Sequence, residues 1–444
     1  MTQAPATQTL ERLRSGALAG ATRLDLPGCG LSAFPREIFE LAESLEVLNL
    51  TGNALAELPA DFARLSRLRI LFCSENQFTH LPEVLGDCPQ LDMVGFKSNR
   101  IAQVSGAALP PRLRWLILTD NEIGELPDEL GQRPRLQKLM LAGNRLSALP
   151  DAMAACQQLE LLRIASNRFE QLPDWLFTLP RLSWLAFAGN SVAQASEETA
   201  VIAHPVPDVD WADLQLQEVL GQGASGVIHR ATWKEWKDPV AVKLFKGHIT
   251  SDGSPLSEMD ACIAAGAHAN LIPVRGRIAG HPEGTPGLVL DLVDAAYRNL
   301  AGPPSFESCT RDVYAGGTSF DWRSLLAIAQ GMASALAQLH RRGILHGDFY
   351  AHNILWDGAH DALLGDFGAA SFFAPASHQA LALQRIEARA FGCLLEELLH
   401  RCQGMPGQRE REALAQLQAR CFERDPRQRP DMRQIAFELA ALAH

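Results

Sequence analysis

Lysine is scarce in this chain of 444 residues: among its 40 basic residues only six are lysines, and acidic residues exceed the basic ones to leave a net charge of −11. A chain this acidic is not expected to bind nucleic acid or an anionic membrane as its main partner. The nine cysteines are scattered without a Cys-x-x-Cys pair, which favours buried, reduced thiols over disulfides or zinc. No uninterrupted apolar stretch approaches about 18 residues, and residues 1–20 lack an apolar segment behind a basic start, so neither a membrane span nor a signal peptide is predicted. These absences favour a cytoplasmic protein.

The dominant feature of the N-terminal half is an internal repeat. Between successive asparagines the spacing is 23 residues, with one copy of 22, and apolar residues recur around each asparagine. The asparagines are Asn53, Asn76, Asn99, Asn121, Asn144, Asn167 and Asn190, with Cys29 at the same place in the first copy. The pattern resembles the leucine-rich repeat. One coil cannot bury its leucines alone, so the copies must stack, and each asparagine side chain is expected to satisfy backbone groups of a neighbouring turn.

A catalytic motif lies in the C-terminal half. Residues 346–353 read His-Gly-Asp-Phe-Tyr-Ala-His-Asn, and residues 363–368 read Leu-Leu-Gly-Asp-Phe-Gly. Apolar pairs flank the turn dipeptide Asp357-Gly358, so a loop that leads into a hairpin is predicted. This segment delivers one amide and two carboxylates to one place, as phosphoryl transfer requires. It resembles the protein-kinase signature, which implies that Asp348 is the catalytic base and that Asn353 and Asp366 hold Mg²⁺.

A glycine-rich segment precedes a strand that contains Lys243. A Gly-x-Gly-x-x-Gly pattern also occurs in dinucleotide-binding folds, but there a helix follows, whereas here strand-like residues follow. The segment therefore resembles the kinase glycine-rich loop and the lysine that holds the α- and β-phosphates of ATP. The nucleotide-binding residues that the resemblance implies are Leu220, Gly221, Gly223, Gly226, Ile228, Ala241, Lys243, Asp291 and Val293, the last two through the backbone of a hinge strand.

The lysine of a kinase pairs with an acidic residue on the next helix. Glu258 is the first choice here, and Asp260 is the alternative because the spacing from Glu258 to His268 is about one residue longer than usual. Leu290 is the expected gatekeeper of the hinge strand. The resemblance covers about residues 214–444, although residues 303–317 fit no part of it.

Several positions depart from the kinase pattern. Gly347 replaces the arginine that usually precedes the catalytic aspartate, so control by phosphorylation of the activation segment is not expected. Tyr350 replaces a lysine that contacts the γ-phosphate in most serine/threonine kinases, and neither Tyr350 nor His352 is a fixed cation at pH 7. Only 17 residues, 369–385, separate the Asp-Phe-Gly motif from the next apolar helix, and no Ala-Pro-Glu follows. The platform that aligns a peptide is therefore expected to be short.

Two further departures concern the end of the domain. Glu387 stands where the family usually has an aspartate, and Arg429 lacks its usual glutamate partner. These departures affect the expected substrate more than the expected nucleotide.

Side chains alternate along a strand, so residues between the buried leucines of the repeats are expected to face the concave surface. These residues are unusually apolar: Ile70, Phe72, Met93, Trp115, Ile117, Met140, Leu161 and Trp184. A contiguous exposed apolar face usually marks a contact. We expect it to bind a client protein or the chain's own kinase domain, with contact residues Phe72, Trp115, Ile117, Met140 and Trp184.

The sequence thus predicts a multidomain α/β protein with a leucine-rich-repeat solenoid followed by a two-lobed, protein-kinase-like α+β domain. The expected segments are an N-terminal stretch at 1–18, eight repeats at 19–192, a linker without helix periodicity at 193–212, and the kinase-like domain at 213–444. The resemblance implies a soluble, bacterial, ATP-dependent serine/threonine kinase. Two alternatives stay open: a pseudokinase scaffold, favoured by Gly347 and Tyr350, and a small-molecule phosphotransferase, because His-Gly-Asp also resembles aminoglycoside-type enzymes.

Overall fold

The computed structural model describes residues 6–247, 249–404 and 407–442. The chain divides into two compact units. Unit 1 contains residues 1–162 and 167–179, and unit 2 contains residues 163–166 and 180–444. The last two repeats therefore contribute two stretches to unit 2, residues 163–166 and 180–190, which we call the repeat-end segments.

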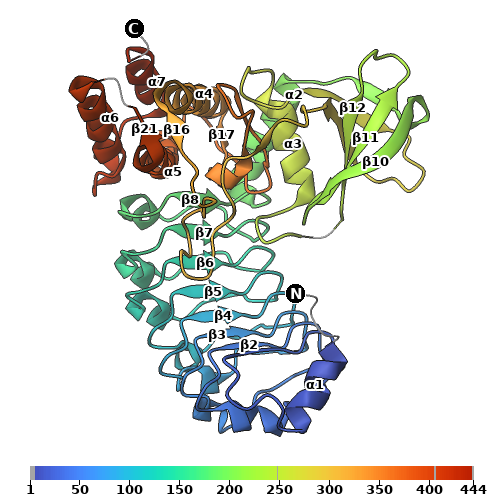
Figure 1. The fold of residues 1–444 in the computed structure, drawn as a ribbon, viewed down its shortest axis with the longest axis vertical. Helices are drawn as coiled ribbons and strands as arrows, with labels where there is room; N and C mark the ends of the chain where they lie inside the picture. The colour runs from blue at the N-terminus through green and yellow to red at the C-terminus, as the bar shows by residue number, and fades with distance from the viewer. Residues whose placement is uncertain (1–5, 248, 405–406, 443–444) are drawn as a thin grey trace. The chain divides into compact units, whose positions relative to one another are not determined.

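The repeats build a parallel sheet of eight short strands in chain order. The strands are β1 (Arg23–Asp25), β2 (Val47–Asn49), β3 (Ile70–Phe72), β4 (Met93–Gly95), β5 (Trp115–Ile117), β6 (Lys138–Met140), β7 (Leu161–Arg163) and β8 (Trp184–Ala186). Seven 3₁₀ helices lie in the returns between the strands of the described chain: Arg36–Leu41, Phe62–Arg64, Glu83–Leu85, Gly106–Ala108, Asp128–Gln132, Asp151–Ala155 and Asp174–Thr178. Figure 1 shows the strands stacked one after another with these returns beside them. The central residue of each strand is buried and is a leucine, as in Leu48 and Leu116, except in β4, where it is Val94.

The repeated asparagines bind backbone groups between neighbouring coils. Asn144 Nδ2 donates to the carbonyl oxygens of Leu118 and Leu141, each at 2.9 Å, and its Oδ1 accepts from the N–H group of Ile123 at 3.1 Å. Asn76 and Asn121 repeat this arrangement. The side chain of each asparagine therefore satisfies groups that the short strand leaves unpaired.

Replacing Asn144 by Ala should lower the free energy of unfolding by about 1–3 kcal/mol, because three buried backbone groups lose their partner. Urea denaturation followed by circular dichroism measures this change. Glu125→Ala, at an exposed position in the adjacent repeat, is the control and should change stability by less than about 0.5 kcal/mol. Equal stability of the two variants would contradict the proposed role of the asparagines.

The N-terminal stretch forms helix α1 (Ala6–Arg14). Its Leu10 and Leu13 are buried, so the helix covers apolar surface at the start of the array. A terminal repeat otherwise exposes its core, which is why solenoids need such caps.

Unit 2 begins, beyond the repeat-end segments, with a six-stranded sheet in the order β10-β11-β12-β14-β13-β9. Its strands are β9 (Asp208–Asp210), β10 (Leu214–Gln222), β11 (Gly226–Trp233), β12 (Val240–Phe245), β13 (Val274–Ala279) and β14 (Gly287–Asp291). Helix α3 (Pro255–Ala265) begins at Ser254, whose side chain accepts from the N–H group of Leu256. The apolar core of this sheet includes Ala231, Val242 and Val289. The strands predicted to follow the glycine-rich segment are confirmed as β11 and β12.

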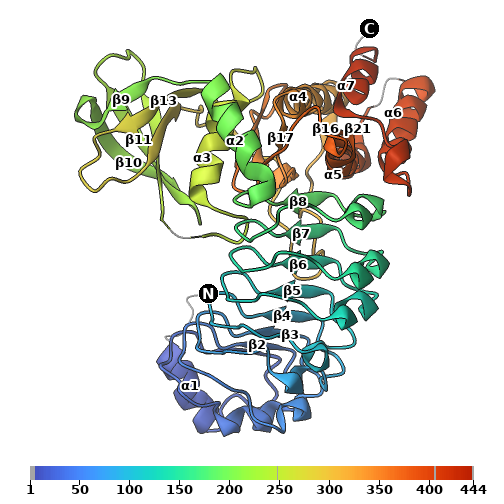
Figure 2. The ribbon, with the colours of Figure 1, turned by 180° about the vertical axis from the view of Figure 1, so that it is seen from behind.

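The expected linker without helix periodicity is wrong. Helix α2 (Ser191–Ala203) occupies most of it, and β9 pairs in parallel with β13. Alanines support this helix through their high propensity, and only Ala193 and Ala200 are buried, so the sequence lacks a strong apolar period. Figure 2 shows α2 beside α3. The segment that follows the last repeat is therefore mostly helical.

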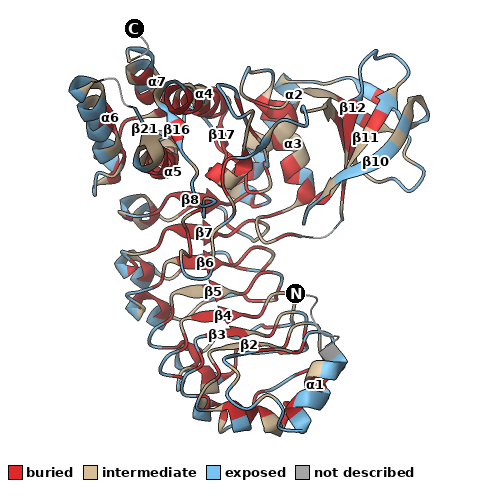
Figure 3. Cartoon of the chain, in the orientation of Figure 1, coloured by how far each residue is buried: buried red, intermediate tan, exposed pale blue. Residues whose placement is uncertain are grey.

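The remainder of unit 2 is mainly helical. Its helices are α4 (Trp322–Arg341), α5 (Ala380–Arg401), α6 (Gln408–Cys421) and α7 (Met432–Ala440). Short strands connect them: β15 (Arg298–Asn299), β16 (Phe320–Asp321), β17 (Ile344–Leu345), β18 (Ile354–Trp356), β19 (Ala362–Leu364), β20 (Ser371–Phe372) and β21 (Cys402–Gln403). Twelve residues of α4 and thirteen of α5 are buried, and Figure 3 shows buried positions on both helices.

These elements confirm the predicted fold class, with repeats followed by a two-lobed domain. The predicted hairpin is present as β18 and β19, in which Ile354 pairs with Leu364. The nine cysteines are free thiols, and six of them are buried. Among the helices of the described ranges, none combines the length and apolar character needed to cross a bilayer.

Candidate active site

A side chain of helix α5 holds the loop that carries Asp348. Glu387 accepts hydrogen bonds from the backbone N–H groups of Gly347 at 2.8 Å and His346 at 3.3 Å, and it pairs with His340 at 2.7 Å. Burial alone would raise the pKa of Glu387, but the hydrogen bonds from His340 and the loop backbone lower it. A buried carboxylate with this many donors stays ionised and holds the loop in one conformation.

The loop and the hairpin place the three expected polar side chains close together. Asn353 Nδ2 donates to Asp348 Oδ2 at 2.8 Å and to the carbonyl oxygen of Asp348 at 2.9 Å. The backbone N–H group of Gly365 donates to the carbonyl oxygen of Asn353 at 3.0 Å, so Asp366 follows directly beside the asparagine. Asp366 itself has a φ of +52°, a left-handed conformation that is uncommon outside glycine and that often occurs at functional positions.

The residues fit a magnesium site that is completed by a nucleotide. The amide nitrogen of Asn353 makes both hydrogen bonds to Asp348, which leaves its amide oxygen as a possible ligand atom, and Asp366 offers a carboxylate. In the described part of the chain no three His, Cys, Asp or Glu side chains gather into a metal cage. Mg²⁺ is usually held by one or two carboxylates together with substrate phosphates rather than by protein alone.

Lys243 on β12 pairs with Glu258 on α3, not with Asp260. Both side chains are nearly inaccessible, with 14% and 1% exposure. Burial alone would lower the pKa of Lys243, but the carboxylate of Glu258 reverses this effect and raises it. The lysine is therefore a positioned cation at neutral pH.

The glycine-rich segment forms the turn between β10 and β11. No described atom lies within 4 Å of a Cβ built at Gly221 or Gly223, so space remains above these residues. Gly226 differs, because a Cβ there would collide with the carbonyl oxygen of Leu244 on β12. Leu220, with 46% exposure, and the half-buried Ile228 lie on either side of this turn.

The expected hinge residues follow β14. Ala241 pairs with Leu290 across β12 and β14, and Val293 is half-buried just beyond the strand. The N–H group of Asp291 donates to the carbonyl oxygen of Pro273 at 3.0 Å, so it is engaged within the sheet rather than directed toward a nucleotide.

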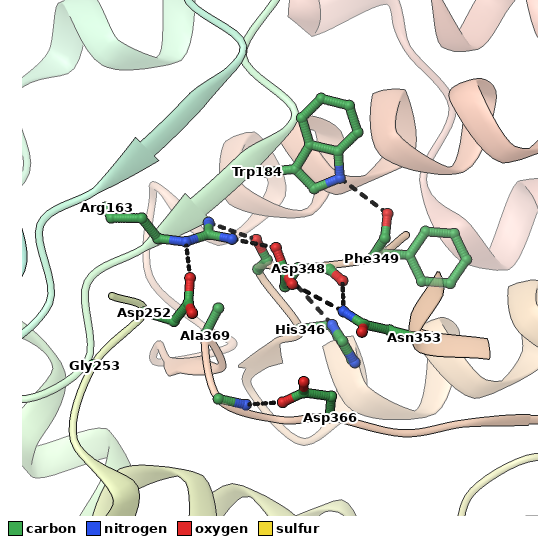
Figure 4. Close-up of polar contacts among 12 residues, drawn as sticks. Arg163, Trp184, Asp252, Gly253, His346, Asp348, Phe349, Asn353, Asp366 and Ala369 are labelled. Atoms are coloured by element: carbon green, nitrogen blue, oxygen red, sulfur yellow. Dashed lines mark hydrogen bonds and ion pairs between the residues drawn. The ribbon is translucent and has the colours of Figure 1, made fainter. Parts of the chain in front are cut away.

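An arginine that the sequence analysis did not select binds the expected catalytic base. Arg163 Nη2 pairs with Asp348 Oδ1, Nη1 donates to the carbonyl oxygen of Gly347 at 2.9 Å, and Nε donates to Asp252 Oδ1 at 2.7 Å (Figure 4). Its side chain is only 1% exposed. The sequence did contain a signal for this residue. The alternating positions of the repeat strands are mostly apolar, and Arg163 is a charged residue at one of them.

Trp184 also contacts this loop. Its Nε1 donates to the carbonyl oxygen of Phe349 at 2.9 Å, and its ring stacks on Tyr350 with centroids 4.2 Å apart and an interplanar angle of 7°. The hydroxyl of Tyr350 is buried without a hydrogen-bond partner among the described atoms. The tyrosine therefore packs against the repeat-end segments.

The unplaced segment 303–317 also supports the catalytic loop. Asp312 accepts from the N–H group of His352 at 2.9 Å and pairs with His352 Nδ1 at 2.7 Å. Burial alone would lower the pKa of His352, but Asp312 reverses this effect and raises it, which favours the imidazolium form. The role of Asp312 did not follow from the motif, because the contact joins positions 40 residues apart.

The expected apolar concave face is mostly buried. The buried members are Ile70, Met93, Met140, Leu161 and Trp184. Only Phe72, Trp115 and Ile117 are half-exposed, and Lys138 lies 4.0 Å from the centroid of the Trp115 ring. The expectation of a continuous exposed stripe is therefore wrong, because alternation along a strand decides only the direction of a side chain and not what covers it.

Comparisons with known proteins agree with this geometry. Residues 214–389 match the family profile of protein tyrosine and serine/threonine kinases, and residues 111–169 and 134–192 match the leucine-rich repeat. An L-type lectin-domain containing receptor kinase of Arabidopsis thaliana is 33% identical over 157 residues, which is 34% of this chain and 20% of that protein. A rice protein of the same type is 32% identical over 189 residues, covering 41% of this chain and 24% of that protein.

A leucine-rich-repeat receptor-like serine/threonine-protein kinase of Arabidopsis thaliana is 29% identical over 163 residues, covering 34% of this chain and 24% of that protein. The chain thus spans about a quarter or less of the length of these curated relatives. These relatives are plant proteins, so the bacterial origin stays a prediction. The motif geometry and the matches together identify a protein-kinase domain that follows an array of leucine-rich repeats.

Proposed function

We propose that this protein is an ATP-dependent protein kinase that transfers phosphate to serine or threonine hydroxyl groups. The observation that carries the proposal is the joint placement of the Lys243–Glu258 pair and of Asp348, Asn353 and Asp366 in one domain. A scaffold without catalysis does not require all of these groups. The proposal therefore favours an active kinase over a pseudokinase, and no observation specifically favours a small-molecule substrate.

Each residue has a distinct role in this proposal. Lys243 holds the α- and β-phosphates of ATP, and Glu258 keeps its ammonium group in place. Asn353 and Asp366 are the protein ligands for Mg²⁺, which neutralises charge on the transferred phosphate. Asp348 accepts the proton of the attacking hydroxyl group, and Glu387 holds the loop on which it lies.

The repeats are proposed to recognise a protein partner. Phe72, Trp115 and Ile117 are the expected contact residues that keep some exposure. Aromatic anchors often carry much of the energy of a protein contact.

Nucleotide binding is the direct test. Mg-ATP at about 100 times its dissociation constant should stabilise the wild type by about 2.7 kcal/mol in a thermal-shift titration. Lys243→Met should lose most of this stabilisation, because the cation between Glu258 and the phosphates is gone. Lys234→Met, which alters a lysine 67% exposed in the same lobe, should behave like the wild type. Transfer of labelled phosphate from ATP to casein, read by autoradiography, then tests the reaction, and a wild type that neither binds Mg-ATP nor transfers phosphate would refute the kinase proposal.

A further inference from the structure

Both oxygens of the Asp348 carboxylate are occupied by side chains of this chain. Asn353 binds Oδ2 at 2.8 Å, and Arg163 binds Oδ1. A general base needs a free oxygen within about 2.6–3.2 Å of the proton that it removes. Arg163 takes the position that the hydroxyl group of a protein substrate would need. A guanidinium group cannot supply a transferable hydroxyl and is not deprotonated in proteins, so it blocks this position.

Arg163 is itself firmly held. Its three bonds reach Asp348, Gly347 and Asp252, the last from the segment between β12 and α3. Burial alone would lower the pKa of Arg163, but the two carboxylates reverse this effect and raise it. A buried charge with two carboxyl partners and a backbone acceptor is an ordered part of the structure rather than a mobile surface side chain.

The repeat-end segments also cover the region where a peptide would lie. The N–H groups of Phe187 and Ala188 donate to Ser371 Oγ at 2.8 and 3.1 Å, and Ser371 belongs to the segment that follows Asp-Phe-Gly. Arg429, which lacks its expected glutamate partner, donates to the carbonyl oxygen of Pro180 at 2.7 Å. Together with the hydrogen bond from Trp184 to the carbonyl oxygen of Phe349, these bonds hold the repeat-end segments against the catalytic loop and the activation segment.

The departures from the kinase pattern coincide with these contacts. Gly347 has a φ of +74°, and a Cβ there would lie 2.7 Å from the carbonyl oxygen of Leu185 and closer still to that of Ala369. At position 347, any larger residue, including the usual arginine, would collide with both of these carbonyl groups, one of which belongs to the repeat-end segments. Tyr350, in place of the usual lysine, provides the ring on which Trp184 stacks. Gly347, Tyr350 and Arg429, three of the residues that differ from the family pattern, therefore contact the repeat-end segments.

The nucleotide side is not covered in the same way. The Lys243–Glu258 pair is formed, and no described atom lies within 4 Å of a Cβ built at Gly221 or Gly223. ATP binding and access of a protein substrate are therefore separable in this arrangement.

We propose that the repeat-end segments occupy the protein-substrate site of the kinase domain, with Arg163 in place of the acceptor hydroxyl, so that the chain binds Mg-ATP but phosphorylates a protein only when Arg163 leaves Asp348. This inference rests on the proposed kinase function. It assigns Arg163, in the repeat-end segments, an inhibitory role within the same chain.

Arg163→Gln is the main test. Initial rates of phosphate transfer to casein should rise about 10- to 100-fold, the equilibrium equivalent of a hydrogen bond to a charged group. The dissociation constant for Mg-ATP, measured by calorimetry on the same protein, should stay within about twofold, because the variant leaves the Lys243–Glu258 pair intact. Arg168→Gln removes the same charge from an exposed position of the same repeat and should not change the rate.

A second variant controls for misfolding. Asp252 is 34% exposed, and Asp252→Asn removes the negative charge from one anchor of Arg163 without altering Asp348. It should raise the rate in the same direction by a smaller factor. Its melting temperature should stay near that of the wild type, which a structural defect would not allow.

The outcomes separate the two proposals. Wild-type protein that does not bind Mg-ATP overturns the kinase function, and the inhibitory role with it. Mg-ATP binding with an unchanged transfer rate in both Arg163→Gln and Asp252→Asn overturns the inhibitory role alone. A transfer rate that falls in these variants while Mg-ATP binding persists would make Arg163 a participant in the reaction, which also overturns inhibition.

Discussion

Replacing Asp348 by Asn should lower the rate of phosphate transfer about 10²–10⁴-fold, the usual contribution of a positioned general base. The amide of Asn cannot accept the proton of the attacking hydroxyl group, whereas the Lys243–Glu258 pair and the glycine-rich turn are unchanged. Mg-ATP should therefore still stabilise the variant. The loss should be measured in the Arg163→Gln background, where the wild-type base is expected to be accessible.

Asp238→Asn provides the matched control, because this aspartate is exposed in the turn between β11 and β12. It should transfer phosphate at the rate of the parent protein. Turnover that survives in Asp348→Asn at the parent rate would exclude Asp348 as the base and would favour a reaction at another site.

Replacing Glu387 by Ala should lower the free energy of unfolding by about 3–5 kcal/mol, because three buried hydrogen-bonding groups lose their partner and each such loss costs about 1–3 kcal/mol. Glu387 is 1% exposed, and the variant would leave His340 and the N–H groups of His346 and Gly347 without their acceptor. Chemical denaturation monitored by fluorescence measures the loss. Glu387→Asp keeps a carboxylate and should lose clearly less.

The pH dependence gives the same test a second readout. The pKa of Glu387 is lower in the folded protein than its ordinary value, so its charge stabilises the fold fully above the unfolded pKa of about 4.3. This stabilisation is lost as the pH falls through the lower folded value. The difference in stability between wild type and Glu387→Ala should thus be largest above about pH 5 and should shrink below pH 4. A constant difference over this range would show that the ionised carboxylate is not what holds the loop.

The repeats could be predicted from the sequence because each copy depends on a local periodicity. An aliphatic residue in the middle of each strand, usually leucine, and an asparagine at a nearly fixed interval act between adjacent coils, so the register of one copy predicts the next. The catalytic loop, the hairpin at β18 and β19, and the strand of Lys243 were readable for a similar reason. Their residues lie within short motifs whose turns and alternation are local.

Helix α2 was not readable in this way. Its alanines carry little apolar contrast, and its place is decided by packing against α3. The support of His352 by Asp312 was also hidden, because residues 303–317 match no motif and meet the loop only after the lobe has folded.

The sequence by itself determined the two architectures and the chemical groups of the active site, because both rest on motifs that act over short distances along the chain. Only the tertiary structure decided that Arg163 binds Asp348, that Trp184 stacks on Tyr350, and that Gly347 admits the backbone of Leu185. The Arg163–Asp348 contact joins residues 185 positions apart, and no local pattern specifies which buried carboxylate an arginine will meet. Its partner is set by the requirement that a buried charge be paired, and that pairing exists only once the distant segments have packed together.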